Sequence, residues 1–374
     1  GTEGAGRGWR MLMESLAAGR GISLPATSTG GVKHVGRVAS AHALSRRQFG
    51  VSIGKFEGIE EPLARIGGYA YLLEAARRYT NGALATGAKP AVVTAIAKYN
   101  FTELGRQAIN DGMDILGGNA ISRGPRNQLA HAYINTPISI TVEGANILTR
   151  TLMIFGQGAI RCHPYALKEI AALDGRDVAA FDAVFWKHIG HVVRNASRAL
   201  VLSVTRGWLS PAPVSGPTAK YYRRLSWASA SFAFLADLAM GTLGGELKRK
   251  EKLTGRFADI FSWMYLSAAT LRRFEAEGRR EEDQPFVEWS LEYGLREMQL
   301  AFDGLFKNMR VPLLTWLFKG PIAAWSRFNP LSNGPRDSVG HRVAAAILTP
   351  GEQRERLFEG SFVQTDEAKG VARM

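Results

Sequence analysis

The interpretation of this chain is organised around the stretch Ile138-Ser139-Ile140-Thr141-Val142-Glu143-Gly144-Ala145-Asn146-Ile147-Leu148-Thr149-Arg150. It places one carboxylate, Glu143, between an apolar, β-branched run and a glycine that opens a second apolar segment of helical character. Burial in apolar surroundings disfavours the charged form of a carboxylate and raises its pKa. Proteins use this effect to make a glutamate basic enough to take a proton from carbon near neutral pH. The alternative is a first-turn glutamate stabilised by a helix N-terminus.

Apolar residues recur at helical spacing on the N-terminal side of this stretch. Pro90 suits the first turn of a helix, and Gly117-Gly118 suits its end. Residues 17–21, rich in alanine and glycine, are expected to separate the first two helices. The predicted helices cover residues 9–16, 24–47, 56–84, 90–116 and 146–160, with a loop over 119–137. Several long helices joined mostly by short turns predict an antiparallel bundle.

The second half of the chain repeats this helical character after a predicted linker over residues 161–177. Further helical patterns cover residues 178–209, 221–243, 253–277, 287–306 and 312–328. Few segments show the apolar–polar alternation typical of strands. We therefore expect an all-α protein with two domains: a helical bundle over residues 1–161 and an additional basic helical domain over residues 162–374.

The chain carries a formal net charge of +14, and the excess is distributed over both halves. Such a balance suits anionic partners, namely nucleic acid, an anionic membrane surface or phosphate-bearing small molecules. No zinc-finger spacing, basic leucine-zipper pattern or RNA-recognition aromatic motif is present. We therefore expect no nucleic-acid partner.

Two features bear on thiol and metal chemistry. Cys162 is the one cysteine, which excludes an intrachain disulfide and fits a reducing compartment. It precedes His163-Pro164, a typical helix end, and a structural role is favoured over a reactive thiol. His188 and His191 can share a helix face, but a metal site needs further ligands and none is evident nearby. We expect packing roles for both histidines and no metal.

No segment has a clean membrane-spanning length, and the nearest, Trp227–Gly245, is interrupted by Asp237. The apolar segment over residues 311–321 has Arg310 and Lys319 at its ends, which suits either an interfacial segment or a buried helix. The basic charge balance favours peripheral contact with a membrane. We expect a cytoplasmic protein with possible peripheral contact at the inner membrane.

Several short motifs occur in a fixed order along the first half: Gly19-Arg20, Arg46-Arg47-Gln48-Phe49-Gly50, Phe56-Glu57-Gly58-Ile59, Asp114-Ile115-Leu116-Gly117-Gly118 and Val142-Glu143-Gly144. Each is weak alone, but together they closely resemble the C-terminal helical domain of acyl-CoA dehydrogenases over residues 7–161. The remaining basic half resembles that of the large bacterial fatty acyl-CoA dehydrogenases of β-oxidation.

The resemblance implies a flavoenzyme that oxidises medium- or long-chain acyl-CoA to trans-2-enoyl-CoA. In the family, FAD accepts a hydride from the β-carbon while a glutamate removes the α-proton, and Glu143 occupies the position of that base. Gly144 matches a position near the substrate thioester, and Arg20 matches an arginine near the acyl-CoA and the base. The family further implies a homo-oligomer and electron-transfer flavoprotein as the acceptor.

The resemblance also implies two cofactor-binding segments. Arg46, Gln48 and Phe49 match a segment that reaches the FAD of a partner subunit. The backbone contacts to FAD from a neighbouring subunit map to Asp114, Ile115, Gly117 and Gly118. Asn146 stands where the family carries a hydroxyl to FAD, and it is the expected substitute.

The chain departs from the family at several positions. Asp114 replaces the usual glutamine, Val142 the usual tyrosine before the base, and Ala17 the usual aspartate shortly before Arg20. The family's N-terminal helical domain and middle β-domain have no counterpart in these residues. We expect this part of the protein alone to bind FAD poorly and to be inactive. The alternative reading is a non-catalytic helical scaffold that docks a membrane or a partner.

Overall fold

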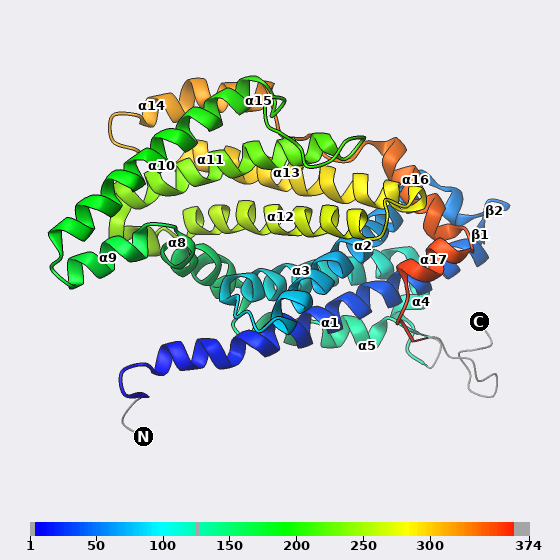
Figure 1. Ribbon diagram of the computed structural model, residues 1–374. Coiled ribbons are helices and arrows are strands. Elements are labelled where there is room, and N and C mark those ends of the chain that lie inside the picture. The colour runs from blue at the N-terminus through cyan, green and yellow to red at the C-terminus, as the bar shows by residue number, and fades with distance from the viewer. Residues whose placement is uncertain (1–3, 125–126, 363–374) are drawn as a thin grey trace. The chain divides into compact units, whose positions relative to one another are not determined.

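The computed structural model describes residues 4–124 and 127–362. Most of these residues are helical (Figure 1). Strand pairing within the described ranges is limited to the hairpin β1 (Arg47–Gln48) and β2 (Val51–Ser52), in which Arg47 pairs with Ser52. The all-α fold class predicted from the sequence is therefore confirmed.

The chain forms two compact units, and their boundaries interleave along the sequence. Unit 1 comprises Gly1–Asn146, Ala269–Glu292 and Gly334–Met374, and unit 2 comprises Ile147–Ala268 and Tyr293–Asn333. This division differs from the two consecutive ranges expected from the sequence, whose standing as domains stays a prediction. The long helices α12 (Glu251–Ala276) and α13 (Gln284–Asn308) contribute residues to both units.

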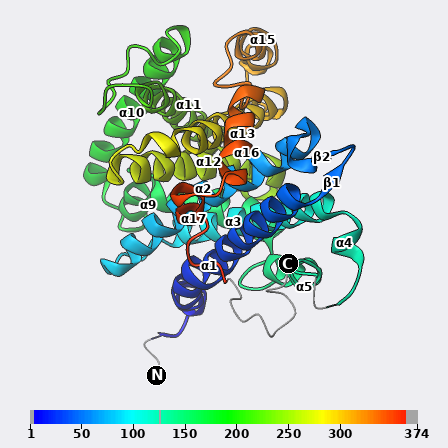
Figure 2. The same cartoon turned by 90° about the vertical axis from the view of Figure 1, so that its right-hand side faces the viewer.

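Unit 1 is built on three long helices. Figure 2 shows the β1–β2 hairpin extending beyond the end of the first of them. The remaining elements of unit 1 are short, apart from the residues of α12 and α13. Its elements are α1 (Gly8–Ser45), η2 (Ile53–Lys55), α2 (Glu57–Ala85), α3 (Ala91–Leu116), α4 (Gly118–Ile121), α5 (Ala130–Asn135), α6 (Pro137–Thr141), η5 (Glu281–Asp283), α16 (Asp337–Leu348) and α17 (Glu352–Leu357).

Helix α1 continues through residues 17–21, where a break was expected, and that expectation is wrong. Its glycines serve close packing rather than a turn. A Cβ on Gly21 would lie 2.7 Å from Cγ2 of Thr94 on α3. Only a glycine lets the two helices approach this closely without displacing the threonine. The interior glycine therefore costs helix propensity but permits the α1–α3 contact.

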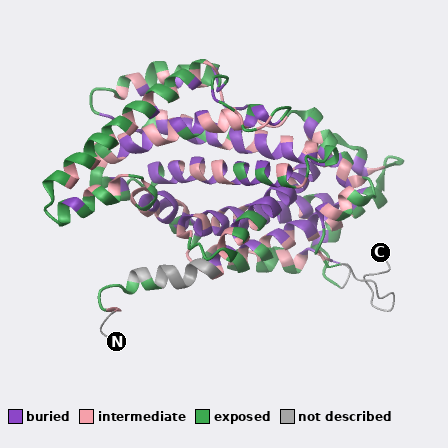
Figure 3. Cartoon of the chain, in the orientation of Figure 1, coloured by how far each residue is buried: buried purple, intermediate pink, exposed green. Residues whose placement is uncertain are grey.

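Helices α2 and α3 agree with their predicted ranges, and most of α2 is coloured as buried in Figure 3. Gly117 ends α3 with φ 55°, in the left-handed region that favours glycine. The loop expected over residues 119–137 instead contains α4 and α5. Asn127 holds this region together, because its side chain donates to Ala120 O at 2.6 Å and accepts from Ala130 N at 2.9 Å.

A buried carboxylate, Glu74, organises the charged groups inside unit 1. Its oxygens lie 3.1 Å from Lys33 Nζ, and they accept hydrogen bonds from Arg77 and Arg78 at 2.8 and 2.6 Å. Burial alone would raise the pKa of Glu74, but the hydrogen bonds from Arg77 and Arg78 and the charge of Lys33 together lower it to about 2. The charges are therefore compensated within the core.

Unit 2 holds the rest of the helices. The expected helix over 146–160 forms with a π-helical segment in its middle, and the helix expected over 312–328 likewise forms over 315–328 with a π-helical segment. The expected linker over 161–177 contains a helix. Its elements are α7 (Asn146–Leu148), η3 (Thr149–Gln157), α8 (Gly158–Cys162), α9 (Ala166–Asp174), α10 (Val178–Val204), α11 (Ala219–Leu243), η4 (Gly244–Arg249), α14 (Thr315–Leu317), η6 (Phe318–Ile322) and α15 (Ala323–Phe328).

The core of unit 2 is aromatic. Phe155 stacks on Phe257 with ring centroids 4.4 Å apart, and Phe232 meets both rings edge-on. Arg150 pairs with Asp259 through Nε at 2.7 Å. Nowhere in the part of the chain that the structure describes is a helix both long and apolar enough to cross a membrane.

Candidate functional site

Glu143 lies in the turn between α6 and α7, within unit 1. Its φ is 56°, and the φ of Gly144 is 99°, so two consecutive residues adopt left-handed conformations. A side chain with a Cβ rarely takes this conformation without a compensating reason. Strained residues of this kind cluster at functional sites, where the surrounding structure holds them in place.

The carboxylate of Glu143 is half-buried and has one free oxygen. Oε2 is buried and has no hydrogen-bond partner. Oε1 lies 3.4 Å from the position that a Cβ on Gly19 would occupy. Gly19 of α1 therefore lies directly beside Oε1, and Oε2 makes no hydrogen bond within the protein.

Arg20 holds the backbone of this turn. It is 2% exposed, and its Nε donates to Glu143 O at 3.0 Å. Burial lowers the pKa of the Arg20 guanidinium, and the negative charge of Glu143 opposes this shift. The structure thus brings together Arg20 and Glu143, which the sequence placed 123 residues apart.

Lys98 of α3 is a second buried cation at this turn, and the sequence analysis missed it. It is fully buried, and its Nζ donates to Gly144 O at 2.7 Å and to Asn146 Oδ1 at 2.6 Å. Burial and the nearby charge of Arg20 lower the pKa of Lys98 to about 8. The available signal was its place three residues after Ala95 and three before Phe101, on a buried stripe of α3.

Asn146 is tied into the fold rather than left open. Its Nδ2 donates to Thr102 Oγ1 at 2.9 Å and to Glu103 Oε1 at 2.7 Å, while its Oδ1 accepts from Lys98. Every polar atom of this buried amide is therefore used inside the protein. Its cofactor-binding role, expected from the resemblance, stays a prediction.

The residues expected to reach a partner's cofactor lie on the β1–β2 hairpin. Arg46, Gln48 and Phe49 are all exposed, and the ring of Phe49 is 94% exposed. Phe49 also has φ 51°, and its ring meets that of Phe56 edge-on at 6.3 Å. An exposed aromatic side chain in a strained turn is unusual in a packed domain and suits contact with another molecule.

The second expected cofactor segment lies at the junction of α3 and α4. Ile115 is buried, whereas Asp114, Gly117 and Gly118 are exposed. A Cβ on either Gly117 or Gly118 would meet nothing within 4 Å. The junction therefore presents open backbone that a planar group can approach closely.

Two family models match the chain. Acyl-CoA dehydrogenase, C-terminal domain, covers residues 6–154, and Acyl-CoA dehydrogenase, C-terminal, bacterial type, covers residues 160–374. The second match spans more than half of the chain. The protein therefore belongs to the acyl-CoA dehydrogenase family, as the motifs around Glu143 indicated.

Solved structures show the same fold. An acyl-CoA dehydrogenase from Bacillus anthracis, complexed with FAD, is similar with a TM-score of 0.69 at 17% identity over 92% of this chain and 57% of that chain. An acyl-CoA oxidase from tomato gives a TM-score of 0.57 at 12% identity, with 92% of this chain and 51% of that chain covered. Acyl-CoA oxidase-1 from Caenorhabditis elegans, complexed with FAD and ATP, gives 0.54 at 12% identity over 92% and 50%. The chain thus spans slightly more than half the length of the first of these proteins and about half of the others.

A short local similarity also exists to Protein HemX from Proteus mirabilis. It is 54% identical over 41 residues, which is 11% of this chain and 24% of that protein. The similarity is confined to one segment and leaves most of both chains unmatched.

Proposed function

We propose that this chain is the C-terminal part of an FAD-dependent acyl-CoA dehydrogenase that oxidises saturated medium- or long-chain acyl-CoA to trans-2-enoyl-CoA in fatty-acid β-oxidation. The observation that carries the proposal is the Glu143 turn. It combines a free carboxylate oxygen with a strained backbone that Arg20 and Lys98 hold through their hydrogen bonds. The chain's membership of the family supports the same assignment.

In the proposed reaction, Glu143 takes the proton from the α-carbon of the acyl thioester. Arg20 and Lys98 are positioning residues, because each donates to a backbone carbonyl of the turn rather than to the carboxylate itself. A base positioned in this way contributes roughly 10²- to 10⁴-fold to the rate.

FAD, when bound, supplies the acceptor for the hydride that leaves the β-carbon. The residues present fit this cofactor at two places. Phe49 offers an exposed ring on the β1–β2 hairpin, beside Arg46 and Gln48, and Gly117 with Gly118 offers open backbone. Because these groups face outward, we propose that they complete the FAD site of another copy in a homo-oligomer. Electron-transfer flavoprotein is the proposed acceptor of the electrons.

The test is the visible absorption spectrum of the protein translated from its complete reading frame. We expect a flavin band that bleaches when a long-chain acyl-CoA is added without oxygen. The matched control is the trans-2-enoyl-CoA of the same length, which is already the oxidised product, has no saturated α–β bond to oxidise and should leave the band in place. A colourless protein that stays unchanged with added FAD would contradict the proposal.

A second candidate function is docking to a membrane, with a cytoplasmic protein bound peripherally at the inner membrane. Large apolar side chains are exposed in residues 311–328 of unit 2, namely Leu313, Leu314, Trp316, Trp325 and Phe328. Arg310 and Lys319 accompany them in a protein of net charge +14. Sedimentation with anionic lipid vesicles tests this candidate. We expect Trp316→Ser with Phe328→Ser to lower the bound fraction, and equal binding of the variant would contradict it.

A further inference from the structure

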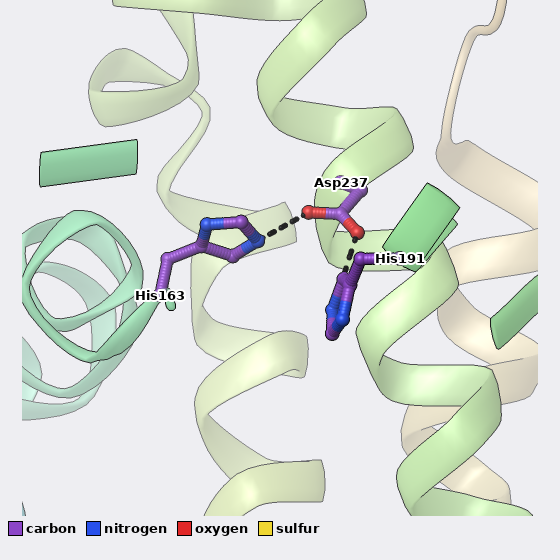
Figure 4. A group of neighbouring side chains, drawn as sticks. All are labelled: His163, His191 and Asp237. Carbon is purple, nitrogen blue, oxygen red and sulfur yellow. Dashed lines mark ion pairs between the residues drawn. The ribbon is translucent and has the colours of Figure 1, made fainter. Parts of the chain in front are cut away.

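Three side chains with metal-binding atoms meet inside unit 2 (Figure 4). His163 is the first residue after α8, His191 lies on α10 and Asp237 lies on α11. One nitrogen of each histidine and one carboxylate oxygen all lie within 4.8 Å of one another. Three separate elements thus direct their polar atoms to one point.

Two of the polar atoms at this point make no hydrogen bond. Asp237 Oδ1 lies 2.7 Å from His163 Nε2, and Asp237 Oδ2 lies 3.9 Å from His191 Nε2. His163 Nε2 and Asp237 Oδ2 are nonetheless buried without a hydrogen-bond partner. The Asp237 side chain is 3% exposed. A buried carboxylate with a free oxygen is costly unless a cation pairs with it.

A second layer of residues orients the cluster. His188 Nδ1 lies 2.8 Å from Glu169 Oε1, and its Nε2 lies 3.4 Å from Asp237 Oδ1. The ring of Tyr165 stacks on His188 with centroids 5.7 Å apart. Carboxylate–histidine pairs of this kind commonly support metal ligands and fix the orientation of their rings. His188 is therefore held in place to support Asp237 or to join it.

Two other groups face His191. Asn195 Nδ2 lies 2.9 Å from its Nε2, and Arg194 Nη2 lies 3.2 Å from its Nδ1. An ion bound to Nε2 would replace the contact with Asn195. Because Nδ1 would then carry the ring proton, the Arg194 guanidinium would have to turn away from it. Asp237 and Glu169 provide two negative charges near the point, against the single positive charge of Arg194.

We propose that His163, His191 and Asp237 bind a divalent transition metal of the zinc class. Two imidazoles and one carboxylate suit Zn²⁺ and its neighbours, whereas Ca²⁺ and Mg²⁺ prefer oxygen ligands. With metal–ligand distances of about 2.0–2.2 Å, tetrahedral ligand atoms lie roughly 3.3–3.6 Å apart. The three ligand atoms lie within 4.8 Å of one another, so side-chain shifts of about 1 Å bring them into this range. Water or His188 would fill the fourth position.

The consequence of such a site is a cross-link between the end of α8, α10 and α11. It is independent of Glu143, which belongs to unit 1. The sequence predicted no metal because only His188 and His191 are close in the chain. His163 and Asp237 join them only through the fold.

The test is a titration of the metal-free, complete protein with Co²⁺, followed by Zn²⁺. We expect one Co²⁺ per chain with the visible absorption of a tetrahedral site, and displacement of the Co²⁺ by Zn²⁺. His163→Gln, His191→Gln and Asp237→Asn should each weaken Co²⁺ binding at least ten-fold. His188→Ala should weaken it by roughly 10- to 100-fold, as loss of a supporting contact does.

The matched control is His341→Ala. This histidine is exposed on α16 and pairs with Glu60, so its loss removes an imidazole elsewhere and should leave Co²⁺ binding unchanged. Circular dichroism and thermal unfolding without metal show whether each variant folds. If Asp237→Asn does not fold, Co²⁺ binding by His163→Gln and His191→Gln decides whether the site exists. Absence of a Co²⁺ site in the natural protein, or binding by the ligand variants equal to that of the control, would overturn the proposal.

Discussion

At the scale of single residues, Glu143 combines a backbone conformation that favours glycine with a side chain that has a buried, unpartnered oxygen. Its left-handed φ of 56° favours glycine, yet the residue is a glutamate with a buried, unpartnered oxygen. Stability alone explains neither feature. The hydrogen bonds from Arg20 and Lys98 to the backbone of the turn are the contacts that offset the strain.

Lys98 gives this turn a pH dependence. Its pKa in the folded protein, about 8, lies below the ordinary lysine value of 10.5, so the unfolded chain binds more protons between these two pH values. The contribution of Lys98 to the free energy of unfolding should therefore rise with pH through this window, by at most about 1.4 kcal/mol per pH unit. Denaturant unfolding of the natural protein and of Lys98→Met, from pH 7 to 10, measures the difference in slope.

The exposed residue Lys89 supplies the control, because Lys89→Met removes a lysine just before α3 and should keep the slope of the natural protein. Equal slopes in the natural protein and Lys98→Met would show that Lys98 titrates alike in the folded and unfolded states.

Part of the site could be anticipated from sequence and part could not. Motif order pointed to Glu143 and Arg20, and the fold places them in contact. Lys98 was missed because nothing local marks a lysine as buried among apolar neighbours. The cofactor-binding role of Asn146 stays a prediction. Its hydrogen bonds to Thr102 and Glu103 could not be anticipated, because no local pattern places these two residues beside it.

At the scale of elements, close helix packing depends on particular glycines of α2. A Cβ on Gly68 would lie 1.9 Å from Cε3 of Trp289, so Gly68→Ala should displace the indole. We expect a loss of about 1–3 kcal/mol in the free energy of unfolding, as for other overpacked cores. Denaturant unfolding measures the loss.

Gly82→Ala is the matched control in the same helix, since a Cβ there would meet nothing within 4 Å. It should stabilise the protein by up to about 1 kcal/mol through helix propensity. A Gly68→Ala protein as stable as Gly82→Ala would contradict the packing account.

The charge network around Glu74 makes a second prediction for α2. Glu74→Gln leaves Lys33 and Arg77 without their buried counter-charge, and we expect it to cost about 3–5 kcal/mol. The exposed pair Arg37–Glu355 is the comparison, because Glu355→Gln should cost less than about 1 kcal/mol.

The pH dependence of the Glu74 contribution follows from its lowered pKa. The stability that Glu74 provides is fully present above the ordinary glutamate pKa of 4.5 and is lost as pH falls toward about 2. Unfolding curves recorded between pH 6 and 2.5 should therefore converge for the natural protein and Glu74→Gln. Curves that stay parallel would argue against a stabilising network.

Helices were predicted more reliably than the connections between them. The 3.6-residue period located α2, α3 and the long helices of the second half, because a buried stripe follows directly from the apolar pattern. The break predicted at residues 17–21 was wrong, because Gly21 allows close packing against a neighbouring helix and does not form a turn. Short helices such as α5 and α9 were not predicted, because a helix of so few turns shows too little apolar periodicity.

At the scale of the whole molecule, the chain order does not match the spatial division. Residues 269–292 and 334–374 belong with the N-terminal unit, although more than a hundred residues separate them from it. Composition and periodicity do not reveal that segments distant in the sequence belong to the same compact unit. The overall helical class was accessible from sequence, whereas the interleaving of the units was not.

The open cofactor segments lead to a prediction for the isolated 374-residue chain. Arg46, Phe49 and Gly117, which we propose contribute to an FAD site, are all exposed, so we expect residues 1–374 alone to bind FAD poorly. Fluorescence titration with FAD measures the affinity. Tight, stoichiometric binding by this chain would contradict the prediction.

The most direct test of the central claim is the rate at which long-chain acyl-CoA bleaches the flavin of Glu143→Gln, measured anaerobically in the protein from the complete reading frame. The account predicts a rate lower by about 10²- to 10⁴-fold with the flavin still bound. Glu352→Gln, on the exposed face of α17, should react at the natural rate. Unchanged bleaching by Glu143→Gln would contradict the assignment of Glu143 as the base.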